Sequence, residues 1–216
     1  MDFLSNIMQT ALTFFYNVTT SIGFPNYGIA IILLTIAIKA LMYPLTVKQV
    51  KSMKAMQDIQ PKMKELQEKY KGNPEKLNKE LANLYKEAGV NPLAGCLPLL
   101  VQMPFLIAIF FAIRDYQYAL LPPSFLWMTD LAQPDPTFIL PVLSALTTYI
   151  QQKQTTTEMT QQNKMMLIFM PIFIGYISLT FPAGLVLYWV VSNMFQIGQQ
   201  WFMYRNNAPV AREEAR

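Results

Sequence analysis

Five apolar stretches alternate with polar segments along the chain, and most of them have the length that a helix needs to cross a bilayer. The third stretch is short for that purpose. Only the tripeptide FPA separates the last two, which predicts a tight helical hairpin. The pattern therefore predicts an all-α, polytopic membrane protein. Its five transmembrane helices are expected at residues 27–47, 92–113, 137–152, 165–180 and 184–204.

The longest polar segment, residues 48–91, has apolar side chains every three or four positions, as in an amphipathic helix. The motif KGNP interrupts this pattern with a glycine suited to end one helix and an asparagine and a proline suited to begin another. The segment is therefore predicted to be a hairpin of two antiparallel helices. Its Met53, Met56 and Met63 either pack between the two arms or contact a client or partner, because methionine adapts to varied apolar surfaces.

The remaining segments are shorter. Residues 1–26 carry Phe3, Ile7, Leu12 and other apolar side chains at helical spacing, which predicts an amphipathic helix lying on the membrane surface. Residues 114–136 and 153–164 are predicted loops, and residues 205–216 a short tail.

Lysine and arginine are distributed unevenly between these segments. Residues 48–89 contain ten lysines, whereas the residues before the first span contain no Lys or Arg. The loop 114–136 has one Arg, the loop 153–164 two Lys and the tail three Arg. Because cytoplasmic segments are enriched in Lys and Arg, the N-terminus and the loop 114–136 are predicted outside. The hairpin, the loop 153–164 and the tail are predicted in the cytoplasm.

The composition excludes several kinds of chemistry. With 53% hydrophobic and 14% charged residues, the chain is too apolar for an ordinary water-soluble domain. It has no histidine, which removes the commonest general base and most zinc sites, and its single Cys96 excludes an internal disulfide. No metal, cofactor or nucleotide site is predicted. The motif LAGC ends at Cys96 like a lipoprotein signal, but it follows a charged helical segment, so Cys96 is predicted to pack within a span.

One cation lies inside a predicted span. Lys39 is near the middle of the first span, and none of the five spans contains Asp or Glu. A charge at this depth is costly unless it reaches the headgroups or has water and polar neighbours. The next lysine, Lys48, is about 13 Å further along the helix. That is longer than a lysine stem comfortably reaches, although snorkelling remains an open alternative.

Polar neighbours recur at helical spacing in other spans. They are Ser144, Thr147, Thr148 and Gln151 in the third and Trp189, Ser192, Asn193, Gln196 and Gln200 in the fifth. A single Ser or Thr in a membrane is usually a helix-packing residue, but these stripes together with Lys39 predict a wet groove. The residues predicted to line it are Lys39, Thr35, Tyr43, Gln102, Thr147, Thr148, Gln151, Gln152, Trp189, Ser192, Asn193 and Gln196.

Several extended motifs, in order, resemble the YidC/Oxa/Alb family of membrane protein insertases. They are IKALMYPLT followed by KQVKSMKAMQDIQPKMKELQEKYKGNPEKL, then NPLAGCLPLLVQMPFLIAIFFAI, and finally FPAGLVLYWVVSNMFQIGQQ. The resemblance covers nearly the whole chain, from the first span to the end of the fifth. The direct passage from a leading helix into the first span resembles the Gram-positive form of YidC.

The resemblance implies five spans around a groove that is open to the cytoplasm and to lipid but closed outside. A positive charge on the first span, here Lys39, would attract the acidic outer part of a client protein. The client's apolar segment would then slide out along the third and fifth spans, at Gln151 or Gln152 and at Trp189. The family usually has Arg where this chain has Lys39, and Lys can lose its proton when desolvated.

The family also implies a location and partners. The location is the bacterial plasma membrane, and the partners are nascent membrane protein clients and the lipid bilayer. The Sec translocon and the translating ribosome are candidates. The short, nearly balanced tail RNNAPVAREEAR does not predict tail-based ribosome binding, and no nucleic-acid readout is expected.

The predicted function is the insertion and folding of client transmembrane segments, without covalent chemistry or nucleotide hydrolysis. An alternative is a small secondary transporter with Lys39 in a midplane substrate site, although the five spans show no inverted pairing. A hydrolase is disfavoured, because the chain has no histidine and no G-x-S-x-G motif. A passive scaffold for assembling other spans would use the same groove and remains open.

Overall fold

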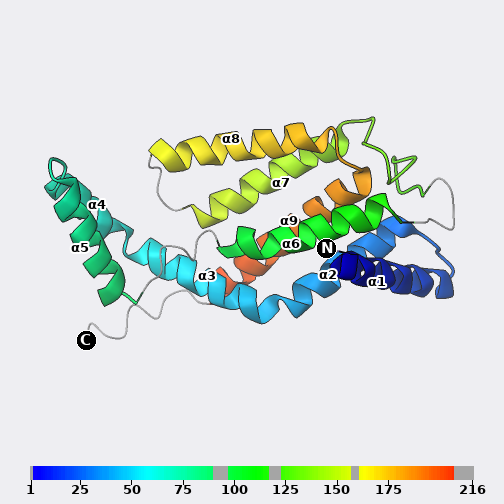
Figure 1. The fold of residues 1–216 in the computed structure, drawn as a ribbon, viewed down its shortest axis with the longest axis horizontal. Coiled ribbons are helices and arrows are strands. Elements are labelled where there is room, and N and C mark those ends of the chain that lie inside the picture. Colours follow the sequence, from blue (N-terminus) through cyan, green and yellow to red (C-terminus); the bar gives the residue numbers. More distant parts are fainter. Residues whose placement is uncertain (1, 90–96, 117–122, 157–160, 207–216) are drawn as a thin grey trace. The chain divides into compact units, whose positions relative to one another are not determined.

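The computed structural model describes residues 2–89, 97–116, 123–156 and 161–206, in which all regular elements are helices (Figure 1). The chain forms two compact units. Unit 1 comprises Met1–Leu41 and Phe105–Arg216, and unit 2 comprises Met42–Pro104. The helices are α1 (Asp2–Ser21), α2 (Tyr27–Leu41), α3 (Tyr43–Asp58), α4 (Gln60–Lys69), α5 (Pro74–Glu87), α6 (Leu97–Arg114), α7 (Ile139–Thr155), α8 (Gln161–Ser178) and α9 (Ala183–Asn206).

Unit 2 contains the helical hairpin. The turn between α4 and α5 lies at the KGNP motif, where the Asn73 side chain accepts a hydrogen bond of 3.0 Å from the Lys76 amide and Pro74 begins α5. The two helices pack together, and the Tyr85 hydroxyl donates to the Met63 sulfur at 3.8 Å. The first arm differs from the single helix expected from the spacing. It breaks at Ile59, because Pro61 lies in the first turn of α4.

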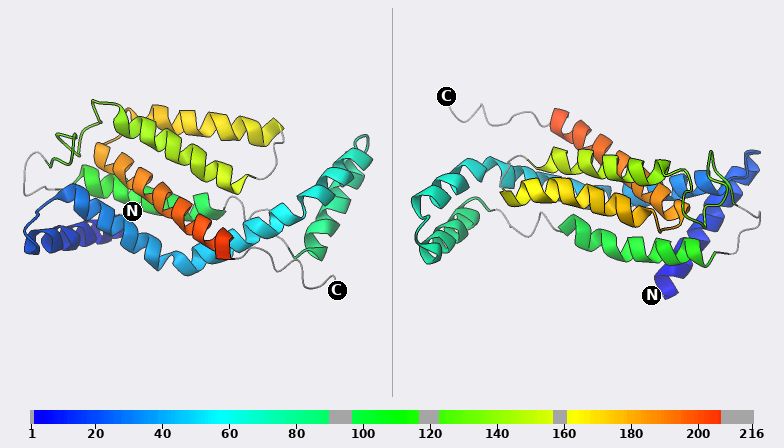
Figure 2. Two further views of the ribbon diagram at one scale, coloured as in Figure 1. Left: turned by 180° about the vertical axis from the view of Figure 1, so that it is seen from behind. Right: turned by 90° about the horizontal axis from the view of Figure 1, so that it is seen from above.

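Unit 1 contains the longer apolar helices. Helix α7 packs against α8 and α9, and α2 packs against α1 and α9. Figure 2 shows α7, α8 and α9 side by side in both views. Helix α2 begins at a cap, because the Asn26 side chain accepts from the Ile29 amide at 3.1 Å. It ends at Leu41, short of the predicted boundary at residue 47, and Pro44 lies in the first turn of the next helix.

Within the described residues, no single helix is both long and apolar enough to count as a membrane span. Only α2 and α3 meet the length and composition criteria, as a bent pair. Because the regular elements of the described residues are all helices, the structure supports the all-α class. Cys96, most of the tail 205–216 and parts of the loops 114–136 and 153–164 fall outside the described residues.

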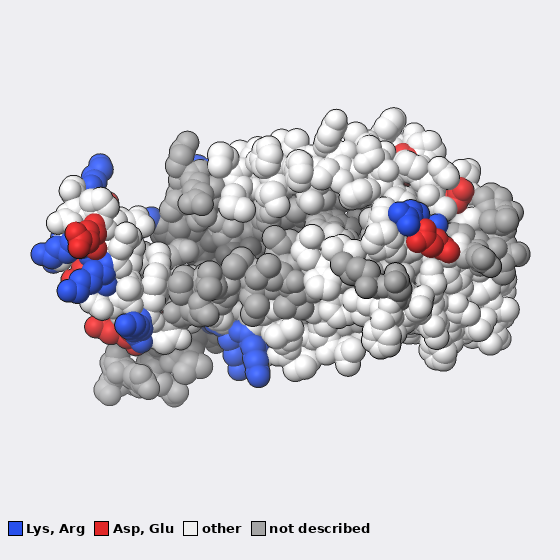
Figure 3. Space-filling model, in the orientation of Figure 1, with Lys and Arg blue, Asp and Glu red and all other residues white. Residues whose placement is uncertain are grey.

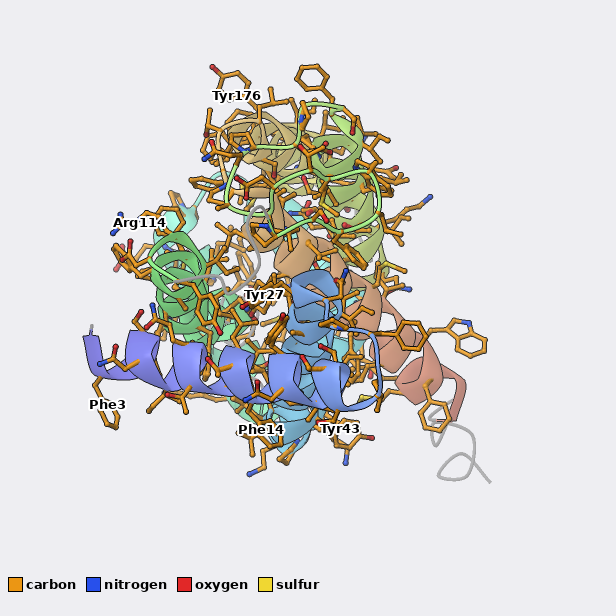
Figure 4. The ribbon with its side chains drawn as sticks, turned by 90° about the vertical axis from the view of Figure 1, so that its right-hand side faces the viewer. Phe3, Phe14, Tyr27, Tyr43, Arg114 and Tyr176 are labelled. Carbon is orange, nitrogen blue, oxygen red and sulfur yellow. The ribbon has the colours of Figure 1, made fainter. Side chains whose placement is uncertain are left out.

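Helix α1 is amphipathic, as its spacing predicts. Met8 and Leu12 are buried, whereas Phe3 is 80% exposed and Phe14 is exposed with it. Figure 4 shows the side chains of Phe3 and Phe14 pointing away from the other helices. The rings of Tyr16 and Tyr27 stack with centroids 4.0 Å apart, which fixes α1 against α2.

Residues 123–138 form a loop that lies against the first turns of several helices in unit 1. The amides of Ala183 and Gly184, at the start of α9, donate to the carbonyls of Gln133 and Leu131, both at 2.8 Å. Gly28 in α2 lies directly against the ring of Phe125. A side chain at residue 28 would therefore overlap Phe125 close to its backbone.

We expect Gly28→Ala to lower stability by about 1–3 kcal/mol, the usual cost of overpacking a tight contact. Gly198→Ala is the matched control, because nothing lies within 4 Å of the added methyl group. That change should raise stability by about 0.5–1 kcal/mol through the better helix propensity of alanine. Thermal unfolding of the two purified variants in detergent measures the difference, and equal midpoints would contradict the packing described here.

Candidate functional site

A cluster of hydrogen-bonded polar side chains joins α7 to α9 inside unit 1. The Thr148 hydroxyl accepts a hydrogen bond from the Trp189 indole at 3.1 Å and another from the Asn193 amide at 3.1 Å. The Asn193 amide also approaches the Thr147 hydroxyl at 3.3 Å. These four residues, Thr147, Thr148, Trp189 and Asn193, are called the polar seam below. They were all predicted as groove residues from their helical spacing.

Thr147 of the polar seam is also bonded to the backbone of its own helix, α7. The Thr147 hydroxyl donates to the Leu143 carbonyl at 2.8 Å, which leaves its oxygen able to accept from Asn193. Thr147, Thr148 and Asn193 are buried, and Trp189 is half-buried. Hydrogen bonds of this kind between helices fix their register where the surroundings are apolar.

Ser144 belongs to the predicted stripe on α7 but contacts a different helix. Its hydroxyl shares a hydrogen bond of 2.9 Å with that of Ser178 in α8. Ser144 is fully buried and also donates to the Pro141 carbonyl at 2.8 Å. The polar face of α7 therefore serves two neighbours, with Ser144 toward α8 and Thr147 and Thr148 toward α9.

Lys39 and Thr35 lie one turn apart on the buried face of α2, the helix that packs against α9. The Lys39 side chain is only 7% exposed, so it does not extend along the surface as snorkelling requires. Thr35 is fully buried, and its hydroxyl donates to the Ile31 carbonyl at 2.7 Å. An apolar helix thus carries a cation on the face that it turns into the protein.

The other predicted groove residues are not members of the polar seam. Ser192 is buried on α9, and Gln196 on α9 and Gln151 and Gln152 on α7 are half-buried further along the two helices that the seam joins. Tyr43 and Gln102 belong to unit 2, where Tyr43 is 44% exposed. Of the methionines predicted to contact a client, Met53 and Met56 on α3 are half-buried, and Met63 on α4 contacts Tyr85.

The charges of the described residues are concentrated in unit 2. Figure 3 shows Lys, Arg, Asp and Glu over α4 and α5, while the visible face of the apolar helices is largely uncharged. One exception in unit 1 is the pair formed by Arg114 and Asp115, at 2.7 Å. Their mutual hydrogen bond raises the pKa of Arg114 and lowers the pKa of Asp115.

Sequence reasoning overlooked Asp135, which is 3% exposed in the loop 123–138. One carboxylate oxygen accepts from the Thr137 hydroxyl and amide at 2.7 and 3.0 Å. The other accepts from the Leu140 amide at 2.8 Å and the Trp127 indole at 3.4 Å. Burial alone would raise the pKa of Asp135, but these donors together hold it below its usual range. Asp135 lies three residues before Phe138, the N-cap of α7, so the usual N-cap signal does not single it out from the sequence.

Comparison with known proteins gives the class of the chain. The family model described as 60Kd inner membrane protein matches residues 14–210. A Fusobacterium nucleatum protein named membrane protein insertase YidC is 42% identical over 96% of this chain and 100% of its own length. The chain therefore belongs to the YidC/Oxa1 family of membrane protein insertases.

Two further relatives are longer than this chain. The Geobacter sulfurreducens protein named membrane protein insertase YidC is 43% identical over 94% of this chain, which spans only 37% of that relative. A solved structure, described as an active YidC insertase crystal structure with the first transmembrane domain resolved, matches with a TM-score of 0.74 and 27% identity. The match covers 91% of this chain and 46% of the solved chain.

The seam yields a stability prediction. We expect Thr148→Val to lower the free energy of unfolding by about 1–3 kcal/mol, because it removes the acceptor of one buried donor, Asn193, and one half-buried donor, Trp189, and keeps the side-chain shape. Thr35→Val is the control, because this buried hydroxyl bonds to a carbonyl of its own helix. Thermal unfolding of both variants tests the seam. If Thr35→Val lowered the free energy of unfolding as much as Thr148→Val, the stabilising role of the polar seam would be refuted.

Proposed function

We propose that this chain inserts client transmembrane segments through a polar groove built on α2, α7 and α9. The observation that carries the proposal is the polar seam together with a buried lysine in a unit whose helices are otherwise apolar. An ordinary helix bundle has no need of three buried polar groups and a cation on facing helices, since each is costly away from water. Family membership supports the same conclusion.

The finer arrangement is also a proposal. Five transmembrane helices would surround the groove, at the residues expected from the sequence, with the N-terminus outside and the C-terminus in the cytoplasm of a bacterial plasma membrane. The ten lysines of the segment 48–89 support a cytoplasmic hairpin. The exposed Phe3 and Phe14 of α1 support a helix lying in the outer membrane interface, with the lipid bilayer as its partner.

The energy for insertion would come from the client and the membrane potential, since the sequence has no nucleotide-binding motif. Each Leu, Ile, Phe or Val of the client gains about 0.3–0.6 kcal/mol on insertion, which amounts to several kcal/mol for a whole span. Each acidic charge moved outward gains about 2.3 kcal/mol per 100 mV. Both contributions favour clients with short, acidic outer segments.

Lys39 would attract those acidic segments into the groove. Its burial on the face of α2 that carries Thr35 supports a role inside the protein rather than at the headgroups. The family usually has Arg here, whose fork of donors binds a carboxylate at two points, whereas Lys offers a compact charge. The proposed groove would then extend past Thr147 and Thr148 to Gln151, Gln152 and Gln196.

Other roles are separable by experiment. The methionines Met53, Met56 and Met63 would offer a client an adaptable apolar surface, and crosslinking from these positions to a nascent chain would report contact. The Sec translocon and the ribosome are candidate partners, and the Gram-positive subtype is a candidate assignment. A small transporter using Lys39 is the competing function, and solute uptake into vesicles without any client would favour it.

We expect Lys39→Ala to reduce insertion of a client with an acidic outer tail, and Lys39→Arg to preserve it. The assay is insertion of one purified client into proteoliposomes, scored by protease protection, with acidic and neutral versions of the tail. Lys153→Ala is the control, because this lysine is exposed near the end of α7. The loss should be about tenfold for the acidic tail and small for the neutral tail, since about 1.4 kcal/mol corresponds to a factor of ten. Equal insertion by the parent chain and Lys39→Ala would refute the role of the charge.

A further inference from the structure

A cavity of about 630 Å³ lies between α1 and the end of α6, and both walls belong to unit 1. Its lining shares no residue with the polar seam or with the groove predicted from the sequence. Figure 4 shows Phe3 and Phe14 on one side of α1, and Tyr27 and Arg114 on the other side. Because Tyr27 lines the cavity, the cavity lies on the side of α1 that is turned away from the two exposed phenylalanines. A cavity of this size suits a small ligand.

Aromatic rings fix the walls of this cavity to one another. The ring of Tyr16 in α1 stacks on that of Tyr27 in α2, with centroids 4.0 Å apart. The ring of Tyr116, two residues beyond the end of α6, meets Tyr27 edge to face at 5.5 Å. All three tyrosines line the cavity, which is therefore held in shape by contacts among three elements. Tyrosine rings also attract cations through their electron-rich faces.

The hydroxyl groups of the cavity have already used their protons. The Thr10 hydroxyl donates to the Asn6 carbonyl at 2.8 Å, and the Thr13 hydroxyl donates to the Gln9 carbonyl at 2.9 Å. The hydroxyls of Thr13 and Tyr116 are 2.8 Å apart, and since Thr13 has spent its only proton, Tyr116 donates in this bond. The three hydroxyl oxygens can then only accept further hydrogen bonds. They favour a ligand that brings donors.

The charge of the lining favours a cation as well. Asp115 is the one charged residue among the described residues that line the cavity. Its two oxygens accept from Arg114 at 2.7 and 2.9 Å, which lowers the pKa of Asp115 and leaves each oxygen a lone pair for another donor. The amide side chains of Asn6, Gln9 and Asn17 can present either an oxygen or an NH₂ group, so they are compatible with such a ligand.

We propose that this cavity binds the headgroup of a phospholipid that carries a primary ammonium, such as a phosphoethanolamine lipid. The ammonium donates to Asp115 and to the hydroxyl oxygens of Thr10 and Tyr116. The phosphate of the same headgroup meets the exposed guanidinium of Arg114, so the two charges of the lipid match the two charges of the Arg114–Asp115 pair.

A lipid fits this site better than the amino terminus of a peptide, because a peptide amine brings no phosphate for Arg114. The proposal rests on the proposed function for the position of α1 in the membrane interface, where headgroups are abundant. There the exposed Phe3 and Phe14 enter the neighbouring lipid while the opposite side of α1 holds a headgroup. The bound lipid would fasten α1 to the membrane at a defined place.

The test is binding of short-chain lipids to the purified full chain in detergent, counted by native mass spectrometry. Phosphoethanolamine, phosphocholine and phosphoglycerol lipids with identical acyl chains compete in one mixture, and a tripeptide with a free amino terminus is tested separately. The variants are Asp115→Asn and Thr10→Val. Thr20→Val is the matched control, because this exposed α1 hydroxyl also donates to a carbonyl one turn back but does not line the cavity.

We expect the parent chain to bind the phosphoethanolamine lipid about fivefold more tightly than the phosphocholine lipid, since a trimethylated ammonium has no N–H donor. The phosphoglycerol lipid, which lacks the ammonium, should also bind more weakly. Asp115→Asn should remove most of this preference. Thr10→Val should lower phosphoethanolamine binding about threefold, and Thr20→Val should match the parent chain.

Equal binding of the phosphoethanolamine and phosphocholine lipids would overturn the proposal, and this comparison needs no variant. A tripeptide that bound as tightly as the lipid would overturn it as well, since the site would then recognise amines in general. So would an equal loss in Thr10→Val and Thr20→Val. The assay contains no client, so failure of the chain to insert a client would count against the proposed function and leave the ranking of the lipids intact.

Discussion

The hydroxyl group of Thr148 is the point on which the arrangement of unit 1 depends, because it accepts from both Trp189 and Asn193 across the contact of α7 with α9. In apolar surroundings such donors have few other partners, and leaving them unpaired would be costly. The two helices are consequently held in one register. The polar residues of α7 and α9 therefore meet one another at this contact and not the surrounding apolar side chains.

Helical spacing identifies the polar stripes of the site, because period and polarity are local properties. It placed Thr147 and Thr148 on one stripe and Trp189 and Asn193 on another, and the structure shows hydrogen bonds between the two. Their role as the lining of a wet groove stays a prediction. Spacing could not show that Ser144 turns to α8, since that depends on where the neighbouring helix lies. The breaks at Leu41 and Ile59 were missed, although Pro44 and Pro61 signal them, because the apolar pattern continues through both.

The loop 123–138 shows a different limit of sequence reasoning. Its order comes from a buried carboxylate and from carbonyls that meet helix starts distant in the chain, and neither leaves a periodic trace. Asp135 lies three residues before the N-cap of α7, so its bond to the Leu140 amide follows only from the structure.

Gly28 and Gly184 lie at one end of unit 1, where there is little space for a side chain. At the end where these glycines lie, backbone and side chains meet so closely that even a methyl group meets a neighbouring atom. Further along α7 and α9, Gln151, Gln152 and Gln196 are half-buried. A larger side chain at either glycine would have to displace neighbouring atoms before α2 and α9 could pack as they do.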